Sequence, residues 1–191
     1  MSNPFPHRPF YFLRHGQTDW NLEGRMQGHT DIPLNTTGLQ QAHAAALKLQ
    51  PLPITHIVTS PLSRALKTAA IAAEALGLPL HIDSNLKERT FGSLEGSLRR
   101  DLMLQHGIAE HEPYDRILPD DAEQWPATLS RARASIMQWL NAHPAETILF
   151  VGHGAFLRAL HEALTSQYFE AANATPYHYT PTPTGWTMQE V

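Results

Sequence analysis

The feature that most constrains the fold is the alternation of short apolar runs with longer stretches of helical periodicity. The runs cover residues 10–13, 56–59 and 147–151, and each is followed by polar or glycine residues. Continuous apolar runs of this length are typical of strands buried on both faces. The stretches between them place apolar residues three and four positions apart, as amphipathic helices do. The pattern predicts an α/β fold with three layers, in which helices cover both faces of a mostly parallel central sheet.

Four apolar stripes predict the main helices, which begin near Thr36, Ser60–Pro61, Trp125–Pro126 and Gly154. A serine before a proline favours a helix start, because the hydroxyl can cap free N–H groups and proline has none to leave unpaired. Residues 80–82 suggest a further short strand, and 185–191 a last edge strand after a tail rich in threonine and proline.

The stretch from about residue 92 to 124 differs from the rest of the chain. Its length, prolines and mixed polarity predict an irregular insertion that serves as a lid or substrate loop. We expect one domain over residues 1–191, because 191 residues suit a single core of ordinary size.

Composition excludes several classes of function. The chain has no cysteine, so disulfides, thiolate catalysis and thiolate metal sites are ruled out. Its formal net charge is -4, which gives no reason to expect nucleic acid or an anionic membrane as a partner. The first residues show no signal-peptide pattern and no apolar stretch is long enough to span a bilayer, so a cytoplasmic protein is expected. Oligomeric state stays open, with a homodimer among the options.

The basic residues gather where the predicted strands end. Arg14 and His15 follow the first strand, Arg64 lies in the first turn after the second, and His153 follows the third. Ligands of an open α/β sheet bind at the carboxyl ends of its strands. Arginine forks and the N–H groups of helix N-termini both favour a phosphate. Glycines beside the histidines, Gly154 among them, would let backbone approach such a ligand closely.

Phosphoryl transfer at such a site needs a nucleophile and a proton donor. A histidine can be the nucleophile when its other ring nitrogen is held by an acceptor. Glu88 is the candidate donor to the leaving oxygen, since it follows the predicted strand 80–82; Glu95 and Asp83 lie nearby as alternatives. The group Glu110, His111 and Glu112, with His106, lacks metal-ligand spacing and is interpreted as a solvated loop.

Four blocks resemble the histidine phosphatase superfamily, also called the phosphoglycerate mutase-like family. They appear in the order that the family has, and cover most of the chain from residue 10 to about 160. The blocks are Leu13–Asn21 with Gly24–Gly28 and Asp31–Leu34, Thr59–Ala65 with Thr68–Ala69, Glu88–Gly92 with Glu95–Gly96, and Val151–Gly154.

The resemblance implies a phosphoglycerate mutase-like fold and a role for each matching residue. His15 would be the phosphorylated nucleophile and Glu88 the general acid. Arg14, Arg64 and His153 would clamp the phosphoryl oxygens. The loop Gln27–Gly28 would border the site, and Asn21, which equally suits a turn, would donate to the phosphate. No metal or organic cofactor is implied in the phosphatase branch.

One block departs from the pattern, and other functions compete. The family often carries Gly-Glu-Ser before its penultimate long helix, whereas residues 120–124 keep a glutamate, Glu123, without the serine. The pair Arg99–Arg100 suits either a substrate carboxylate or second phosphate, or plain solvated surface. The leading hypothesis is a phosphomonoesterase acting on a small phosphorylated metabolite. The alternatives are a cofactor-dependent phosphoglycerate mutase, a non-catalytic module that binds phosphorylated ligands, and a metal-dependent hydrolase.

Overall fold

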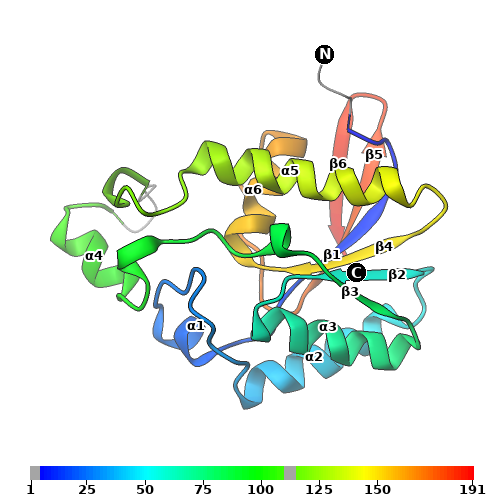
Figure 1. Cartoon of the computed structure of the whole chain (residues 1–191), viewed down its shortest axis with the longest axis horizontal. Helices are drawn as coiled ribbons and strands as arrows, with labels where there is room; N and C mark the ends of the chain where they lie inside the picture. The colour runs from blue at the N-terminus through cyan, green and yellow to red at the C-terminus, as the bar shows by residue number, and fades with distance from the viewer. Residues whose placement is uncertain (1–4, 110–114) are drawn as a thin grey trace.

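A mixed sheet of six strands forms the centre of the computed structural model, which describes residues 5–109 and 115–191 (Figure 1). The strand order is β3-β2-β4-β1-β5-β6. Strands β1 to β4 run parallel to one another. Strand β5 lies beside β1 and antiparallel to it, and β6 lies beside β5 and antiparallel to β5. The strands are β1 (Phe10–Arg14), β2 (His56–Thr59), β3 (Leu80–Ile82), β4 (Ile148–Gly152), β5 (Pro176–Thr182) and β6 (Gly185–Glu190). The predicted α/β fold is confirmed.

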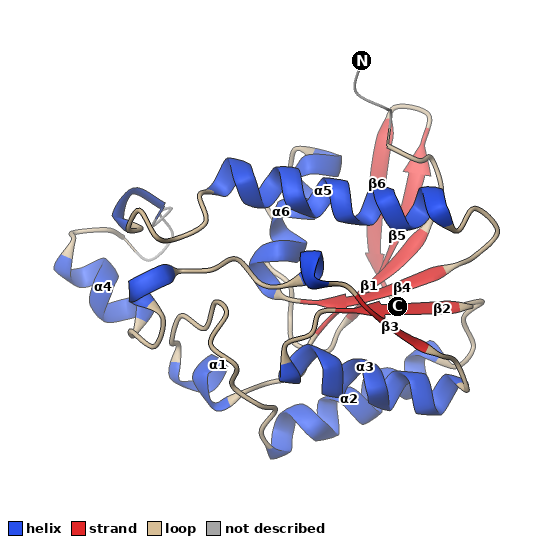
Figure 2. Ribbon diagram, in the orientation of Figure 1, coloured by secondary structure: helices blue, strands red, loops and turns tan. Residues whose placement is uncertain are grey.

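Helices cover both faces of this sheet (Figure 2). One face is covered by α2 (Thr36–Leu49) and α3 (Ser63–Leu76), and the other by α5 (Trp125–Ala142) and α6 (Gly154–Thr165). Alternate residues of β1 explain the two cores. Phe10 and Phe12 pack on the side of α5 and α6, whereas Tyr11 and Leu13 pack on the side of α2 and α3. Both faces of the strand are therefore apolar, which is why it reads as a continuous hydrophobic run.

Two predictions about helices need correction. The second helix begins at Ser63 and not at Ser60–Pro61, and its N-cap residue, Leu62, makes no side-chain cap hydrogen bond. The Ser60 hydroxyl is instead 2.8 Å from Nε2 of His153. In the stretch 92–124, expected to be irregular, α4 (Arg99–Gln105) forms because Met103 and Ile108 pack against Met26 and Phe91. The 3₁₀ turns Gly92–Leu94 and Asp115–Ile117 lie in the same stretch.

The threonine- and proline-rich tail is more regular than its composition suggests. It forms β5, which was not predicted, and β6, which confirms the expected edge strand. Pairing with β1 accounts for β5: Phe10 stacks on Tyr179 and Tyr11 on His178, at ring-centroid distances of 4.9 and 4.4 Å. Within the described residues, no helix combines the length and the apolar character needed to cross a membrane.

Candidate active site

A cavity of about 350 Å³ lies at the carboxyl ends of the parallel strands and is lined in part by α1 (Asp19–Glu23) and α4. Figure 1 shows these two helices at the same end of the molecule. Nearly all residues proposed from the sequence line it together. They are Arg14, His15, Asn21, Gln27, Gly28, Arg64, Glu88 and Gly154. His153 is the exception: it is fully buried beside His15, with 5.2 Å between the two ring centroids.

His15 is held with one ring nitrogen free for chemistry. Its Nδ1 lies 2.7 Å from the carbonyl oxygen of Gly16, and a carbonyl only accepts, so Nδ1 carries the proton. The Nε2 lone pair is then left for an electrophile. Burial and the charges of Arg64 and Arg14 hold the pKa of His15 well below its usual range. The imidazole is therefore neutral at physiological pH, as a nucleophile must be.

The two arginines are fixed by backbone carbonyls and keep donors in reserve. Arg64 donates to the carbonyls of Thr30 and Gly28 at 2.9 and 2.8 Å, and Arg14 donates to Ala171 at 2.6 Å. The Nε of each arginine is buried without a hydrogen-bond partner. Burial lowers the pKa of both side chains, and the carboxylate of Glu88 opposes that shift. The site is thus locally basic within an acidic chain, and it has unused donors.

His153 supplies a third unpaired polar atom. Its Nε2 faces the Ser60 hydroxyl, whose oxygen also accepts from Leu62 N–H, and its Nδ1 is buried without a partner. This arrangement favours a hydrogen bond in which the Ser60 hydroxyl donates to Nε2 of His153. The ring proton of His153 then lies on Nδ1, which is a donor. Burial and the nearby charge of Arg64 hold the pKa of His153 well below its usual range. His153 therefore acts as a neutral donor rather than as a cation.

The carboxylate of Glu88 projects into the cavity from a loop. It accepts hydrogen bonds from the backbone N–H groups of Arg89, Ala155 and Phe156, at 2.9, 3.1 and 3.0 Å. The last two belong to the first turn of α6, which corrects the expectation that this N-terminus is open to a ligand. The N-terminus of α3 is taken as well, since Ser63 N–H donates to Asp31 at 2.8 Å.

The alternative proton donors have structural partners elsewhere. The carboxylate of Glu95 accepts from His29, Thr30, Thr90 and Phe91 and so joins two loops. Burial raises its pKa, but hydrogen bonds from Thr30 and its neighbours outweigh burial and leave the pKa below its usual value.

Asp83 accepts from Ser135 and from the indole N–H of Trp139, and neither it nor Glu95 lines the cavity. Of the carboxylates proposed for the role of general acid, Glu88 is the one that reaches the site.

The remaining proposed residues line the cavity under different structural constraints. Asn21 lies in α1, where its Oδ1 accepts from Thr18 in a capping box, so that its NH₂ group stays available as a donor. Gln27 is buried, with its Oε1 unpaired. Gly28 has a φ of 55°, and a Cβ there would lie 1.9 Å from the Glu95 carboxylate. At Gly154 a Cβ would lie 3.3 Å from Nε of Arg14, so this glycine gives the arginine room as well as lining the site.

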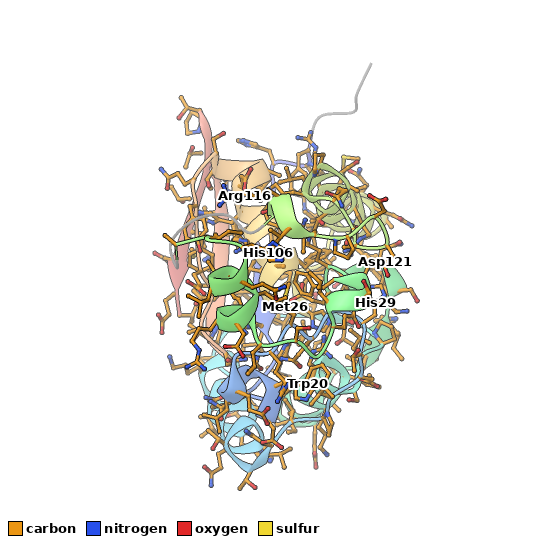
Figure 3. All side chains as sticks on the ribbon, turned by 90° about the vertical axis from the view of Figure 1, so that its left-hand side faces the viewer. Trp20, Met26, His29, His106, Arg116 and Asp121 are labelled. Carbon is orange, nitrogen blue, oxygen red and sulfur yellow. The ribbon has the colours of Figure 1, made fainter. Side chains whose placement is uncertain are left out.

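The outer wall of the cavity is largely missed by sequence reasoning. It contains Trp20, Arg25, Met26, Phe91, Arg99, Arg158, Phe169, Glu170 and Asn173. Figure 3 looks onto this end of the molecule, with Met26 at its centre and Trp20 below it. Of the pair Arg99–Arg100, Arg99 lines this cavity and Arg100 lines a neighbouring one. Residues 169–173 carry no motif in the sequence, so only the fold could bring them here.

The proposed loop cluster around His106 is described in part. His106 is exposed at the end of α4, whereas Glu110, His111 and Glu112 lie outside the described residues. Over residues 5–109 and 115–191, no three histidine or acidic side chains are grouped as metal ligands would be.

The fold and the site define a class of enzyme in which a histidine and two arginines line a cavity at the carboxyl ends of the parallel strands. The family model of the histidine phosphatase superfamily (branch 1) matches residues 10–191. The chain belongs to this superfamily, and is an enzyme with phosphatase activity.

Two sequence relatives show the breadth of the family. The uncharacterized phosphatase PhoE of Bacillus subtilis (strain 168) is 38% identical over 148 residues, which is 78% of this chain and 72% of the relative. The probable phosphoglycerate mutase GpmB of Yersinia pestis (strain Pestoides F) is 38% identical over 115 residues. That match covers 60% of this chain and spans under half, 46%, of the relative's length.

Solved structures agree over nearly the whole chain. YhfR of Bacillus stearothermophilus has a TM-score of 0.83 and 26% identity, and the match covers 95% of both chains. The mycobacterial glucosyl-3-phosphoglycerate phosphatase Rv2419c, solved with VO3, has a TM-score of 0.82 and 26% identity. That match covers 96% of this chain and 97% of the other.

Proposed function

We propose that this enzyme hydrolyses a small phosphorylated metabolite through a phosphohistidine on His15. One observation carries the proposal: three buried nitrogens, Nε of Arg14, Nε of Arg64 and Nδ1 of His153, have no hydrogen-bond partner. Buried polar atoms are rarely left unpaired in folded proteins. An acceptor with several oxygens, such as a phosphoryl group beside His15, would satisfy all three.

The reaction follows from the roles that the residues can take. Nε2 of His15 attacks the phosphorus, and the bond from phosphorus to the ester oxygen breaks. The carboxyl group of Glu88 gives its proton to that oxygen as it leaves. Arg14, Arg64, His153 and the amide of Asn21 stabilise the charge on the equatorial oxygens. Water, whose proton goes to Glu88, then attacks the phosphorus, and the bond to His15 breaks to release phosphate.

The outer wall supports a small substrate with further polar groups. Arg25, Arg99 and Arg158 line the cavity beyond the phosphate position, as do the rings of Trp20 and Phe169. A leaving group that carries a carboxylate or hydroxyls would meet cations there. No resident metal or organic cofactor takes part in this proposal.

The competing candidate is a cofactor-dependent phosphoglycerate mutase, favoured by the similarity to GpmB. A mutase uses the same pocket but returns the phosphoryl group to a substrate hydroxyl instead of water. The test measures phosphate release from a panel of phosphorylated metabolites with excess chelator, alongside isomerisation of phosphoglycerate primed by a bisphosphoglycerate. Chelator-resistant release is expected to dominate. Primed isomerisation without release would favour the mutase, and release that needs a metal would contradict both.

A further inference from the structure

A partly buried ion pair lies behind the proposed general acid, and neither of its residues lines the cavity. Arg131, in the second turn of α5, donates to both oxygens of Glu123, from Nε at 2.8 Å and from Nη2 at 2.6 Å. The two side chains are only 22% and 16% exposed, and neither residue lines the cavity. Two parallel bonds of this kind fix the plane of the guanidinium.

The remaining donors of Arg131 bind the backbone that carries Glu88. Its Nη1 donates to the carbonyls of Asn85 and Lys87, at 2.7 and 2.8 Å, and its Nη2 lies 3.4 Å from the carbonyl of Glu88. From the other side, Nε2 of His29, which is labelled in Figure 3, donates to the Glu88 carbonyl at 2.9 Å. The carbonyls at and before the acid are therefore anchored.

This anchoring matters because the segment has little regular structure of its own. After the short 3₁₀ turn Ser84–Leu86, residues 87–91 belong to no helix or strand, so no ladder of backbone bonds holds them. Arg131 also lies over the ring of Phe156, 5.5 Å from its centroid, and Phe156 N–H is one of the donors to the Glu88 carboxylate. One guanidinium thus contacts both the backbone of Glu88 and the turn that receives its side chain.

We propose that Arg131, held by Glu123, is the positioning residue for Glu88. It fixes the backbone of the acid so that the carboxyl group stays within reach of the leaving oxygen. The inference rests on the proposed function in its choice of Glu88 as proton donor. It also gives Glu123 a role that needs no neighbouring serine: the glutamate binds Arg131, whereas the side chain of Gln124 donates to the carbonyl of Ala122.

The test compares Arg131→Met with Arg8→Met. Arg8 is a matched control, because it also donates to three carbonyls, those of Leu140, His143 and Glu146, at the far end of α5. On an alkyl phosphate, whose leaving group needs a proton, Arg131→Met is expected to lower kcat/KM about 10- to 100-fold, the loss typical of a misplaced group. An aryl phosphate with a good leaving group should lose under about 3-fold. Arg8→Met should change neither.

A double variant separates positioning from general destabilisation. If Arg131 acts through Glu88, then adding Arg131→Met to Glu88→Gln costs nothing further on the alkyl phosphate, because the acid is already gone. Equal losses on both substrates, or additive losses in the double variant, would overturn the proposal. Should Arg131→Met fail to fold, Glu123→Gln replaces it, with a smaller effect of the same pattern expected.

A readout that needs no activity keeps the two proposals distinct. Amide hydrogen exchange at Ala155 and Phe156, whose N–H groups bind Glu88, should rise about tenfold in Arg131→Met and stay unchanged in Arg8→Met. Unchanged exchange in Arg131→Met would overturn the positioning role. If the native protein releases no phosphate, the proposed function fails, and the exchange data still decide whether Arg131 holds Glu88 in place.

Discussion

In the proposed mechanism, the reactivity of the His15 imidazole depends on the hydrogen bond to its neighbour Gly16. The Gly16 carbonyl fixes the proton on Nδ1, and burial between two arginines disfavours a second proton. In the same proposal these arginines stabilise negative charge on a phosphoryl group next to Nε2. The proposed arrangement would therefore keep the nucleophile neutral and also attract the phosphoryl group, which a lone surface histidine could not do.

Glu88 should matter in proportion to the basicity of the leaving group. Glu88→Gln keeps the shape of the side chain but removes its transferable proton. For alkyl phosphates we expect kcat to fall about 100- to 10,000-fold, the usual contribution of general acid catalysis, and for good aryl leaving groups far less. Steady-state kinetics over a series of leaving groups gives the result. A uniform loss across the series would show that Glu88 is not the proton donor.

At the scale of elements, the N-termini of the helices near the cavity bind side chains of the protein itself. The first turn of α6 binds Glu88, and that of α3 binds Asp31. Unpaired N–H groups of a helix N-terminus bind the oxygen atoms of such side chains and hold them in place. The helices therefore position acidic side chains, and in the proposed function the arginine side chains bind the phosphate.

A substitution in the core under α5 should lower the stability of the protein without changing its catalytic residues. Ile136 is fully buried in the cluster that α5 forms with the sheet and α6, and it lies more than one helical turn after Arg131. Ile136→Ala should lower the free energy of unfolding by about 2–5 kcal/mol, from lost burial and a residual cavity. Denaturant titration measures it, with exposed Gln138→Ala as the control. A change below about 0.5 kcal/mol would contradict the assigned packing.

The regular elements were predictable where local pattern and tertiary packing agree. Strands β1, β2 and β4 are buried on both faces, and the stripes of α2, α5 and α6 face the core, so apolar spacing reveals them. Strand β5 could not be found in this way, because Pro176 and Pro181 argue locally against a strand. It pairs with β6 on one side and with β1 on the other, and its aromatic stacking on β1 joins segments more than 160 residues apart in the chain.

The residues of the site likewise fall into those that a local sequence pattern reveals and those that only tertiary contacts bring together. The residues at strand ends carry recognisable blocks, and they line the cavity as expected except for His153, which is buried beside His15. The outer wall from residues 169–173, the carboxylates at the helix N-termini and the contacts of Arg131 depend on distances between segments that no local pattern specifies. Ser60 is an example: its local sequence predicts a helix cap, but its hydroxyl faces His153.

At the scale of the whole molecule, stability should depend on pH through the buried histidines. His15 and His153 have pKa values well below the usual 6.5 in the folded state, because burial and nearby arginines oppose their charge. In the unfolded chain both histidines have the ordinary pKa of about 6.5. Below that pH the unfolded state binds more protons than the folded state, so the free energy of unfolding decreases as the pH falls.

Urea unfolding at about pH 7.5 and about pH 5.5 tests this expectation, since most carboxylates stay ionised across that range. The midpoint should be lower at the acidic value, and replacement of exposed His106 by glutamine should leave the difference unchanged. A midpoint that stays level or rises on acidification would show that the two histidines are not buried as neutral groups.

The most direct test of the central claim follows a radiolabelled phosphoryl group from substrate to protein. The native enzyme and His15→Ala are mixed with a labelled phosphomonoester in excess chelator and quenched in alkali, where phosphohistidine survives, and phosphate release is measured in parallel. We expect label on the peptide that contains His15 in the native enzyme. In His15→Ala we expect neither label nor turnover, and its spectrum should match that of the folded native protein. Label on another residue, or undiminished release by His15→Ala, would contradict the account.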